Sequence, residues 1–281
     1  MTVQAASIAL RHAVANRALL VTAHVVILTL VPRQLSADVK LIPETIAAFD
    51  QYSETADKQF ASRLDGTEAF LWSLSEEATS GALLKGEVVI EPVANAAGLN
   101  VRGGLIHDWV AAVFVPGVDV SDVVRVVTDY DSHEITYSFS ILRSDIVEGD
   151  GSNYHVAMRV MYNALRRVVL EVEHRARYAR LDNQRWWGRS RAVRVQEVRN
   201  PGKPGESLRP PGHDSGYLWR LHTYWRFGEI DGGVVAEYRT VSLTRAIPSG
   251  LGWMLRRLAS RNTRTQLRTV MSLTRDKALS R

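Results

Sequence analysis

The chain has 281 residues, of which 46% are hydrophobic and 23% are charged, so an intrinsically disordered or fibrous protein is excluded. The absence of cysteine excludes disulfides, thiolate metal sites and a cysteine nucleophile. The net charge of +5 is unevenly distributed, because residues 1–37 hold three arginines without an acid and residues 249–281 hold eight basic residues and one acid. Residues 38–248 therefore carry a net charge of −5, and such a body is a poor partner for nucleic acid.

The first 37 residues have the pattern of a secretory signal peptide. Arg11 and Arg17 precede an uncharged, mainly apolar run at 18–31, and the small residues Ser36 and Ala37 follow. This run has 14 residues, whereas a membrane-spanning helix needs about 20. We therefore expect 1–37 to direct a periplasmic or secreted bacterial protein, with an uncleaved N-terminal anchor or a buried helix as alternatives.

Residues 38–100 are expected to form a helical extension followed by a strand. Pro43 occupies a favourable first-turn position, and apolar residues recur at helical spacing as far as Leu64, which predicts a helix over 43–64. A second, short helix is expected to begin after Ser75 and to end near Lys85. The stretch 87–93 is typical of a strand.

The remaining chain alternates strands and turns before one long helix. A strand at 106–115 and a helix at 119–130 are followed by turns rich in Gly, Asp and Asn, as hairpins require. A final helix is predicted from 249 to about 273. This order predicts an α+β fold in which a curved antiparallel sheet wraps around the long C-terminal helix. The strands between the two helices are predicted at 138–147, 153–162, 165–178, 185–198, 217–229 and 233–244.

Three of these strands alternate between apolar and polar residues, so we expect one face of each to be buried and the other to be wet. The strand 185–198 does not alternate cleanly, and its faces stay unassigned. Arg220, His222 and Arg226 fall on a predicted wet face. The predicted buried residues are Tyr154, Val156, Met158, Val160 and Tyr162; Val168, Leu170, Val172, His174 and Ala176; and Tyr217, Trp219, Leu221, Thr223, Trp225 and Phe227.

Several segments resemble proteins of the START-like (Bet v 1-like, SRPBCC) superfamily, which includes polyketide cyclases and lipid-transport proteins. The main one is 113–130, where a Val115-Pro116-Gly117 strand end leads into a helix that finishes in Asp129-Tyr130. Others are 103–109, 218–221, 224–227 and 242–253, which look like an exported bacterial branch. The resemblance covers about 102–260. It implies a helix-grip domain, which we place at 101–275, with a hydrophobic cavity for lipids, sterols, quinones or polyketides.

The sequence has no phosphate-binding loop motif, no dinucleotide-binding glycine motif and no G-x-S-x-G motif, so nothing supports nucleotide binding or serine-hydrolase chemistry. It also has no histidine pair three or four residues apart, so nothing supports a metal site. We therefore assign no catalytic residue, metal or cofactor. Tyr162, His174 and Thr223 place polar groups on the buried face, where a cavity with water or ligand would satisfy them. Plain core packing is the alternative. The candidate ligand-binding residues are Met158, Tyr162, Leu170, His174, Trp219, Thr223, Trp225 and Glu237.

Two further features bear on function. Glu237 and Arg239 share a strand face with Val235 and Val241, so they form an acid–base pair near the cavity if that face is inward, or lie on a mixed edge strand if it is not. The stripe Arg257, Arg261, Arg264 and Arg268 on the final helix is expected to contact anionic lipid headgroups, with a solvated outer face as the alternative. The Pro- and Gly-rich loop 201–216 is a lid or a connector.

The function predicted from these features is binding of a hydrophobic small molecule or lipid in an internal cavity outside the cytoplasm, with transport of that ligand as an extension of the same function. One alternative is a cyclase- or aromatase-type enzyme in the same cavity, with His174 or Glu237 as general acid or base. The other is a structural envelope protein whose cavity is filled by its own side chains.

Overall fold

The computed structural model describes residues 39–163, 167–247 and 252–280. Val39–Arg281 form one compact unit. The predicted signal peptide lies outside the described residues. The predicted boundary between 38–100 and 101–275 stays a prediction.

The N-terminal extension has the predicted helices. A short strand β1 (Val39–Lys40) precedes α2 (Pro43–Leu64), whose ends match the prediction and whose N-terminus carries the proline. Its buried residues include Phe49, Ala56 and Phe60, which lie on one side because they are spaced by seven and four residues. The remaining elements of the extension are η1 (Trp72–Leu74), α3 (Glu77–Leu84), β2 (Val89–Pro92) and β3 (Leu99–Val101).

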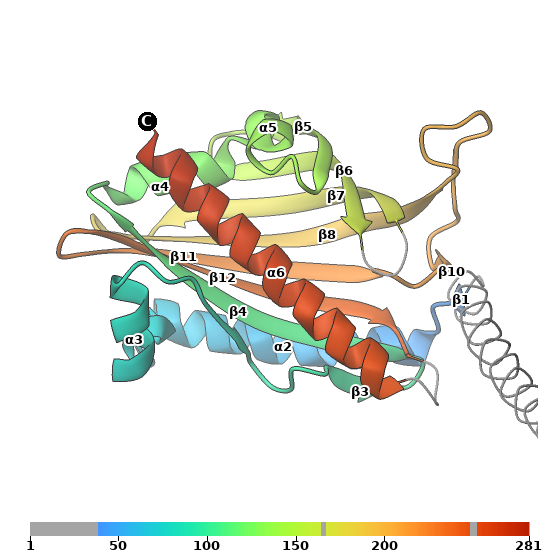
Figure 1. The fold of residues 1–281 in the computed structure, drawn as a ribbon, viewed down its shortest axis with the longest axis horizontal. Coiled ribbons are helices and arrows are strands. Elements are labelled where there is room, and N and C mark those ends of the chain that lie inside the picture. Colours follow the sequence, from blue (N-terminus) through green and yellow to red (C-terminus); the bar gives the residue numbers. More distant parts are fainter. Residues whose placement is uncertain (1–38, 164–166, 248–251, 281) are drawn as a thin grey trace, which may run out of the picture. The chain divides into compact units, whose positions relative to one another are not determined.

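The second part of the chain forms the sheet and the helix that crosses it (Figure 1). Its neighbouring strands are antiparallel, in the order β2-β4-β12-β11-β8-β7-β6-β5, and this arrangement confirms the predicted helix-grip architecture. The sequence did not predict the short helices η2 and α5, which lie between the predicted helix 119–130 and the predicted strand 138–147, and that strand begins at Ile141. The elements are β4 (Gly104–Pro116), α4 (Val120–Thr128), η2 (Tyr130–Ser132), α5 (His133–Thr136), β5 (Ile141–Gly149), β6 (Asn153–Asn163), β7 (Arg167–Arg180), β8 (Arg185–Arg199), β11 (Arg220–Ile230), β12 (Gly233–Arg245) and α6 (Gly252–Leu279).

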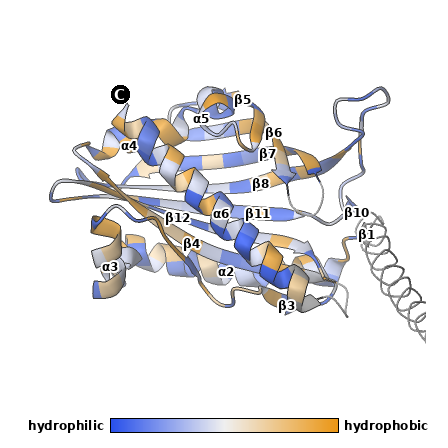
Figure 2. Ribbon diagram, viewed as in Figure 1, coloured by the Kyte–Doolittle hydropathy of each residue, from blue (hydrophilic) through white to orange (hydrophobic). Residues whose placement is uncertain are grey.

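The main core lies between the sheet and the helices α4 and α6. Leu267 and Met271 of α6 pack in one cluster with residues of β4, β6, β7, β11 and β12. The inward faces predicted for β6 and β7 are confirmed, since Met158, Leu170 and Val172 are buried in this cluster while the alternate positions are more exposed. Figure 2 shows the same contrast as alternating colours along these strands.

The opposite face of the sheet is covered over β4, β12 and β11. Phe49 and Phe60 of α2 pack there against Tyr224 and Val241, while Leu71 and Leu83 pack against Ala112 and Val235. The predicted wet face of β11 is therefore wrong: Arg226 is only 5% exposed. Alternation distinguishes the two faces of a strand, but it does not reveal that a remote segment covers the polar one.

The loop between β8 and β11 is attached to the sheet at two places. Its strand β9 (Ser207–Leu208) pairs with β8, and β10 (His213–Asp214) pairs with β1. The carboxylate of Glu206 also accepts a hydrogen bond of 2.8 Å from Arg159 on β6. The loop thus connects the outer part of the sheet to the start of the extension.

Leu170 tests the position of the main core. It is 1% exposed on β7, so Leu170→Ala should lower the free energy of unfolding by about 2–5 kcal/mol through lost contacts and a residual void. Val147 on β5 is 54% exposed, and Val147→Ala should change it by less than about 0.5 kcal/mol. Urea denaturation measures both. Equal, small effects would contradict this placement of the core.

Candidate ligand-binding face

The face of the sheet beneath α6 carries buried polar groups among apolar ones. His174 lies on β7 between Val172 and Ala176, and its Nδ1 is 3.5 Å from the hydroxyl of Ser190 on β8. Burial and, to a smaller extent, nearby His133 lower the pKa of His174 to about 4. Burial also lowers the pKa of His133 to about 4. Both imidazoles are therefore neutral near pH 7, and the face gains hydrogen-bonding groups without gaining charge.

Tyrosines supply most of the remaining polar atoms on this face. The Tyr130 and Tyr178 hydroxyls are 3.0 Å apart, and the Tyr137 hydroxyl is 2.9 Å from that of Thr274 on α6. Burial raises the pKa of Tyr162, whose ring centroid lies 5.0 Å from that of Tyr217, to about 12. These phenols are therefore neutral at physiological pH, where they donate and accept hydrogen bonds.

Two tyrosines of this face, Tyr162 and Tyr238, pack in the core and still keep accessible surface. Both pack against the core cluster, yet both are only partly buried. Trp225 lies beside them, with its ring centroid 4.5 Å from that of Tyr238 and 5.4 Å from the stacked ring of Phe227. The predicted cavity lining requires residues of this kind, which pack in the core and still keep accessible surface.

Six of the eight predicted ligand-binding residues share this face. Met158, Leu170 and Trp225 belong to the core cluster under α6, and Tyr162 packs against it. His174 is two residues away from each of the inward residues Val172 and Ala176 of β7, so it lies on their face. Thr223 lies on the inward face of β11 for the same reason. Their presence on one face agrees with the predicted cavity lining, but binding by these residues stays a prediction.

Trp219 is placed differently from the prediction. It packs with Phe49 and Val241 in the cluster beneath α2, and its indole N–H donates to Asp214 at 2.9 Å. The strand β11 begins only at Arg220, so the two-residue alternation does not extend back to Trp219. Trp219 and Trp225 therefore belong to different core clusters, on opposite faces of the sheet.

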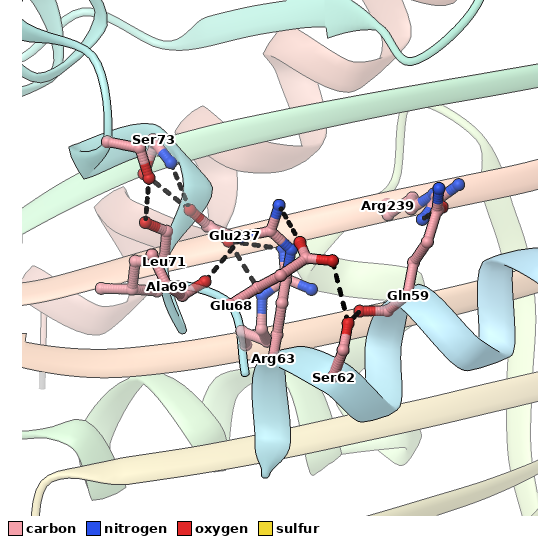
Figure 3. Close-up of polar contacts among 11 residues, drawn as sticks. Gln59, Ser62, Arg63, Glu68, Ala69, Leu71, Ser73, Glu237 and Arg239 are labelled. Atoms are coloured by element: carbon pink, nitrogen blue, oxygen red, sulfur yellow. Dashed lines mark hydrogen bonds and ion pairs between the residues drawn. The ribbon is translucent and has the colours of Figure 1, made fainter. Parts of the chain in front are cut away.

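Glu237 also lies on the other face, so the acid–base pair predicted near the cavity is corrected. Figure 3 shows its carboxylate between β12, β11 and the η1 turn. The Arg226 guanidinium donates to Oε2 at 3.0 and 2.7 Å, and the backbone N–H and hydroxyl of Ser73 donate to Oε1 at 2.8 and 2.7 Å. Because Glu237 is 1% exposed and these four bonds occupy both oxygens, the group serves to attach the extension to the sheet.

A second buried pair lies nearby on the same face. Arg239 donates to both oxygens of Asp108, at 2.9 and 2.6 Å, and the Tyr52 hydroxyl of α2 donates to Asp108 at 2.9 Å. Burial and the Asp108 charge raise the pKa of Tyr52 to about 12, so the phenol keeps its proton. Gln59 of α2 accepts from Arg239 at 2.9 Å. Both pairs thus join strands of the sheet to the extension.

The arginine stripe of α6 is divided by its contacts. Arg264 donates to the carbonyl of Ile90 at 3.0 Å, and its guanidinium carbon lies 4.9 Å from the ring centroid of Trp109. All four arginines are exposed, but Arg257, Arg261 and Arg268 do not make these contacts with β2 and β4. The membrane contact that the sequence predicted therefore rests mainly on these three.

The sequence analysis missed the polar groups between α4 and β5. Tyr130, His133 and Tyr137 pack against one another, with ring centroids 4.8 and 4.9 Å apart along the series. Tyr130 belongs to η2, His133 belongs to α5, and Tyr137 directly follows α5. Both elements are about one turn long, and such short elements leave no periodic signal. The spacing of three and four residues between the three rings was the available indication.

Removal of Arg226 tests the structural role of the Glu237 pair. Arg226→Met leaves a buried carboxylate without its counter-charge and should lower the free energy of unfolding by about 3–5 kcal/mol. Arg226→Met combined with Glu237→Gln removes both charges while keeping an acceptor for Ser73, so it should recover most of that loss. Arg143→Met, which breaks the pairs of a 53% exposed arginine with Asp145 and Glu171, should cost less than about 1 kcal/mol. A loss in Arg226→Met no larger than in Arg143→Met would contradict the assignment.

No family model and no curated protein sequence matches the chain. Among solved structures, it is similar to an aromatase/cyclase from Streptomyces (12% identity, TM-score 0.45, covering 63% of this chain and 95% of that one) and to a STAR-related lipid transfer protein fragment from Xanthomonas axonopodis (16%, 0.43, 63% and 97%). A START superfamily protein from Mycobacterium smegmatis is also similar (7%, 0.35, 59% and 94%). The sheet, its strand order and the long helix across it give this chain the helix-grip fold that its resemblance to START-like proteins implies.

Proposed function

We propose that this protein reversibly binds a hydrophobic small molecule or lipid between the sheet and α6. The observation that carries the proposal is the accessible surface that Tyr162 and Tyr238 keep although both pack against the core cluster beneath α6. A fully packed core leaves no such surface, whereas a ligand site does. The neighbouring residues Met158 and Trp225 supply flexible and aromatic apolar contacts.

The polar groups of this face favour a ligand without charge. His174 is neutral at pH 7, and so is Tyr162, while Glu237 and Arg226 lie on the opposite face and neutralise each other. A charged ligand group would lose its hydration without gaining a counter-charge from these residues. We therefore propose an apolar ligand with one or a few hydroxyl or carbonyl groups, which the tyrosines and His174 would orient.

A cyclase- or aromatase-type enzyme in the same space remains the alternative, but it has one candidate fewer. Glu237 cannot serve as its acid or base beneath α6, because Ser73 and Arg226 hold it on the other face. His174 is the remaining candidate of the two. A structural envelope protein, the other alternative, differs from both in binding nothing.

We also propose that the protein acts outside the cytoplasm and touches a membrane surface through α6. The charged and apolar pattern of 1–37 supports export. On α6, Arg257, Arg261 and Arg268 are exposed beside Met254 and Leu258, which are 43% and 41% exposed. Arginines next to apolar side chains favour an anionic lipid surface. Among the described helices, none is long and apolar enough to cross a membrane.

A hydrophobic fluorophore tests the interior site. It should bind the wild type with micromolar or tighter affinity and quench tryptophan emission. Met158→Trp fills the space from its side and should weaken binding by about tenfold with little change in unfolding free energy. Val147→Trp adds the same side chain at an exposed position of β5 and should bind as the wild type does.

The opposite result would contradict the proposal. In a filled core, Met158→Trp would lower the free energy of unfolding by about 1–3 kcal/mol through overpacking, and the wild type would show no saturable binding to lose. That outcome would favour the structural envelope protein.

Export is tested by the N-terminus of the protein in its own cells. N-terminal sequencing of envelope-localised protein should begin near Asp38, immediately before the compact unit that starts at Val39. A chain recovered from the envelope with its first 37 residues attached would favour the uncleaved anchor. Full-length protein found only in the cytosol would end the proposal of export.

A further inference from the structure

A groove of about 590 Å³ lies on the face of the sheet that points away from α6. It is formed by β5, β6, β7 and β8, and its lining includes the four arginines Arg175, Arg177, Arg189 and Arg191. On β7, Arg175 and Arg177 alternate with the buried residues His174, Ala176 and Tyr178. The groove is therefore separated by the sheet from the interior site.

The strand register places these arginines in two opposed pairs. Arg175 lies opposite Arg191, and Arg177 lies opposite Arg189. Like charges directly opposite each other on one face of a sheet destabilise it. All four side chains are exposed, so this unfavourable arrangement is accessible to a ligand.

A β-bulge in β8 produces this arrangement. The register between β7 and β8 shifts by one residue between Glu173 and His174, so Val193 has no partner on β7. With an unbroken register from the Glu173–Arg194 pair, Arg191 and Arg189 would point to the α6 side of the sheet. The bulge turns them outward instead, which is a common use of bulges near functional sites.

The neighbouring part of the same face is neutralised. Glu171 pairs with Arg143 at 3.5 Å and with Arg159 at 3.2 Å, and Glu173 pairs with His155 at 3.4 Å and with Arg194. The arginines of that part therefore have carboxylate partners on adjacent strands, unlike the arginines of the groove.

Among the described residues, one carboxylate pairs directly with the groove arginines, and it contacts only two of the four. Asp57 of α2 pairs with Arg191 and lies 3.6 Å from Arg189. Arg177 stands over the ring of Trp187, 5.6 Å from its centroid, and Arg175 has no hydrogen bond or ion pair to any described residue. The groove thus has an excess of positive charge.

The two acidic side chains in the lining do not offset this excess directly. Asp150 accepts hydrogen bonds from the backbone of Ser152 and from Asn153 in its own turn. Glu148 lies on the edge strand β5, where the register places it opposite His155 rather than an arginine. Neither carboxylate pairs with any of the four arginines within the part of the chain that the structure describes.

We propose that this groove binds a soluble anion carrying two phosphate-like groups. Guanidinium groups match phosphate oxygens in a two-pronged geometry, so each opposed pair suits one such group. The two pairs are two residues apart along the strands, which corresponds to about 7 Å. Besides Val193 and Tyr154, the large side chains in its lining are polar or charged, so the site favours a soluble anion over a lipid surface. The inference does not depend on the interior site.

Titration with tripolyphosphate at constant ionic strength tests the proposal. Calorimetry should show saturable binding by the wild type, with orthophosphate about tenfold weaker because it engages one pair only. The groove double variant, Arg175→Gln combined with Arg177→Gln, should weaken tripolyphosphate binding by about tenfold. The matched control double variant is Arg143→Gln combined with Arg194→Gln, since it also removes two positive charges from the same face, at residues paired with Glu171 and Glu173, and its affinity should stay within about threefold of the wild type.

Thermal unfolding adds a readout that a structural role of Arg175 would move in the opposite direction. Without anion, Arg175→Gln should unfold at a Tm equal to or above that of the wild type, because it removes a like-charge contact. Tripolyphosphate should raise the Tm of the wild type and of the control double variant, but not that of the groove double variant. A Tm of Arg175→Gln clearly below the wild type would overturn the proposal.

Three further results would overturn it. They are the absence of saturable wild-type binding, equal loss in the control double variant and in the groove double variant, and equal affinity for orthophosphate and tripolyphosphate. Vesicles containing phosphatidylglycerol distinguish the source of the anion, since the wild type and the groove double variant should bind them equally. Loss of vesicle binding in the groove double variant, with tripolyphosphate binding unchanged, would assign the groove to a membrane instead.

Discussion

The strands β4, β12 and β11 are buried on both faces, and the rest of the structure follows from that constraint. Their α6 side is apolar, but their other side carries Asp108, Arg226, Glu237 and Arg239. A charged group that loses water without a partner costs several kcal/mol, so these residues must be paired, and the pairs must also satisfy their remaining hydrogen bonds. The extension provides those bonds through Ser73, Tyr52 and Gln59. The segment 43–84 is therefore an integral layer of the fold.

This arrangement gives the two sides of the sheet different chemistry. Beneath α2, the polar groups are charged, fully bonded and specific in geometry, so they fix how the extension lies on the sheet. Beneath α6, the polar groups are neutral, and Tyr162 and Tyr238 keep accessible surface. A ligand can replace water on the second side without breaking an ion pair. The ion pairs therefore stabilise the sheet while leaving the α6 side available for binding.

The sequence predicted those features that depend on local pattern. Pro43 and a regular apolar stripe define α2, and strict alternation defines the inward faces of β6 and β7. Six of the predicted ligand-binding residues share one face for the same reason. Trp219 and Glu237 were misplaced because alternation says that two faces differ, but not which of two covering layers each meets. The pattern around Glu237 correctly indicated a buried face, and the covering segment, 164 residues earlier at Ser73, could not be inferred from it.

The irregular strand β8 shows how a failure of the pattern can itself be informative. Its residues do not alternate because Val193 is an extra residue at a bulge, and the inward and outward positions exchange there. Before the bulge, Arg189 and Arg191 point outward, and after it Arg194 does so as well. A regular strand would have placed Arg189 and Arg191 beneath α6, where burial without partners is prohibitive. The bulge keeps the α6 side free of charge and, by the same geometry, brings four arginines together on the other face. Both proposed sites thus depend on one irregularity: the interior site needs it to remain uncharged, and the groove needs it to be basic.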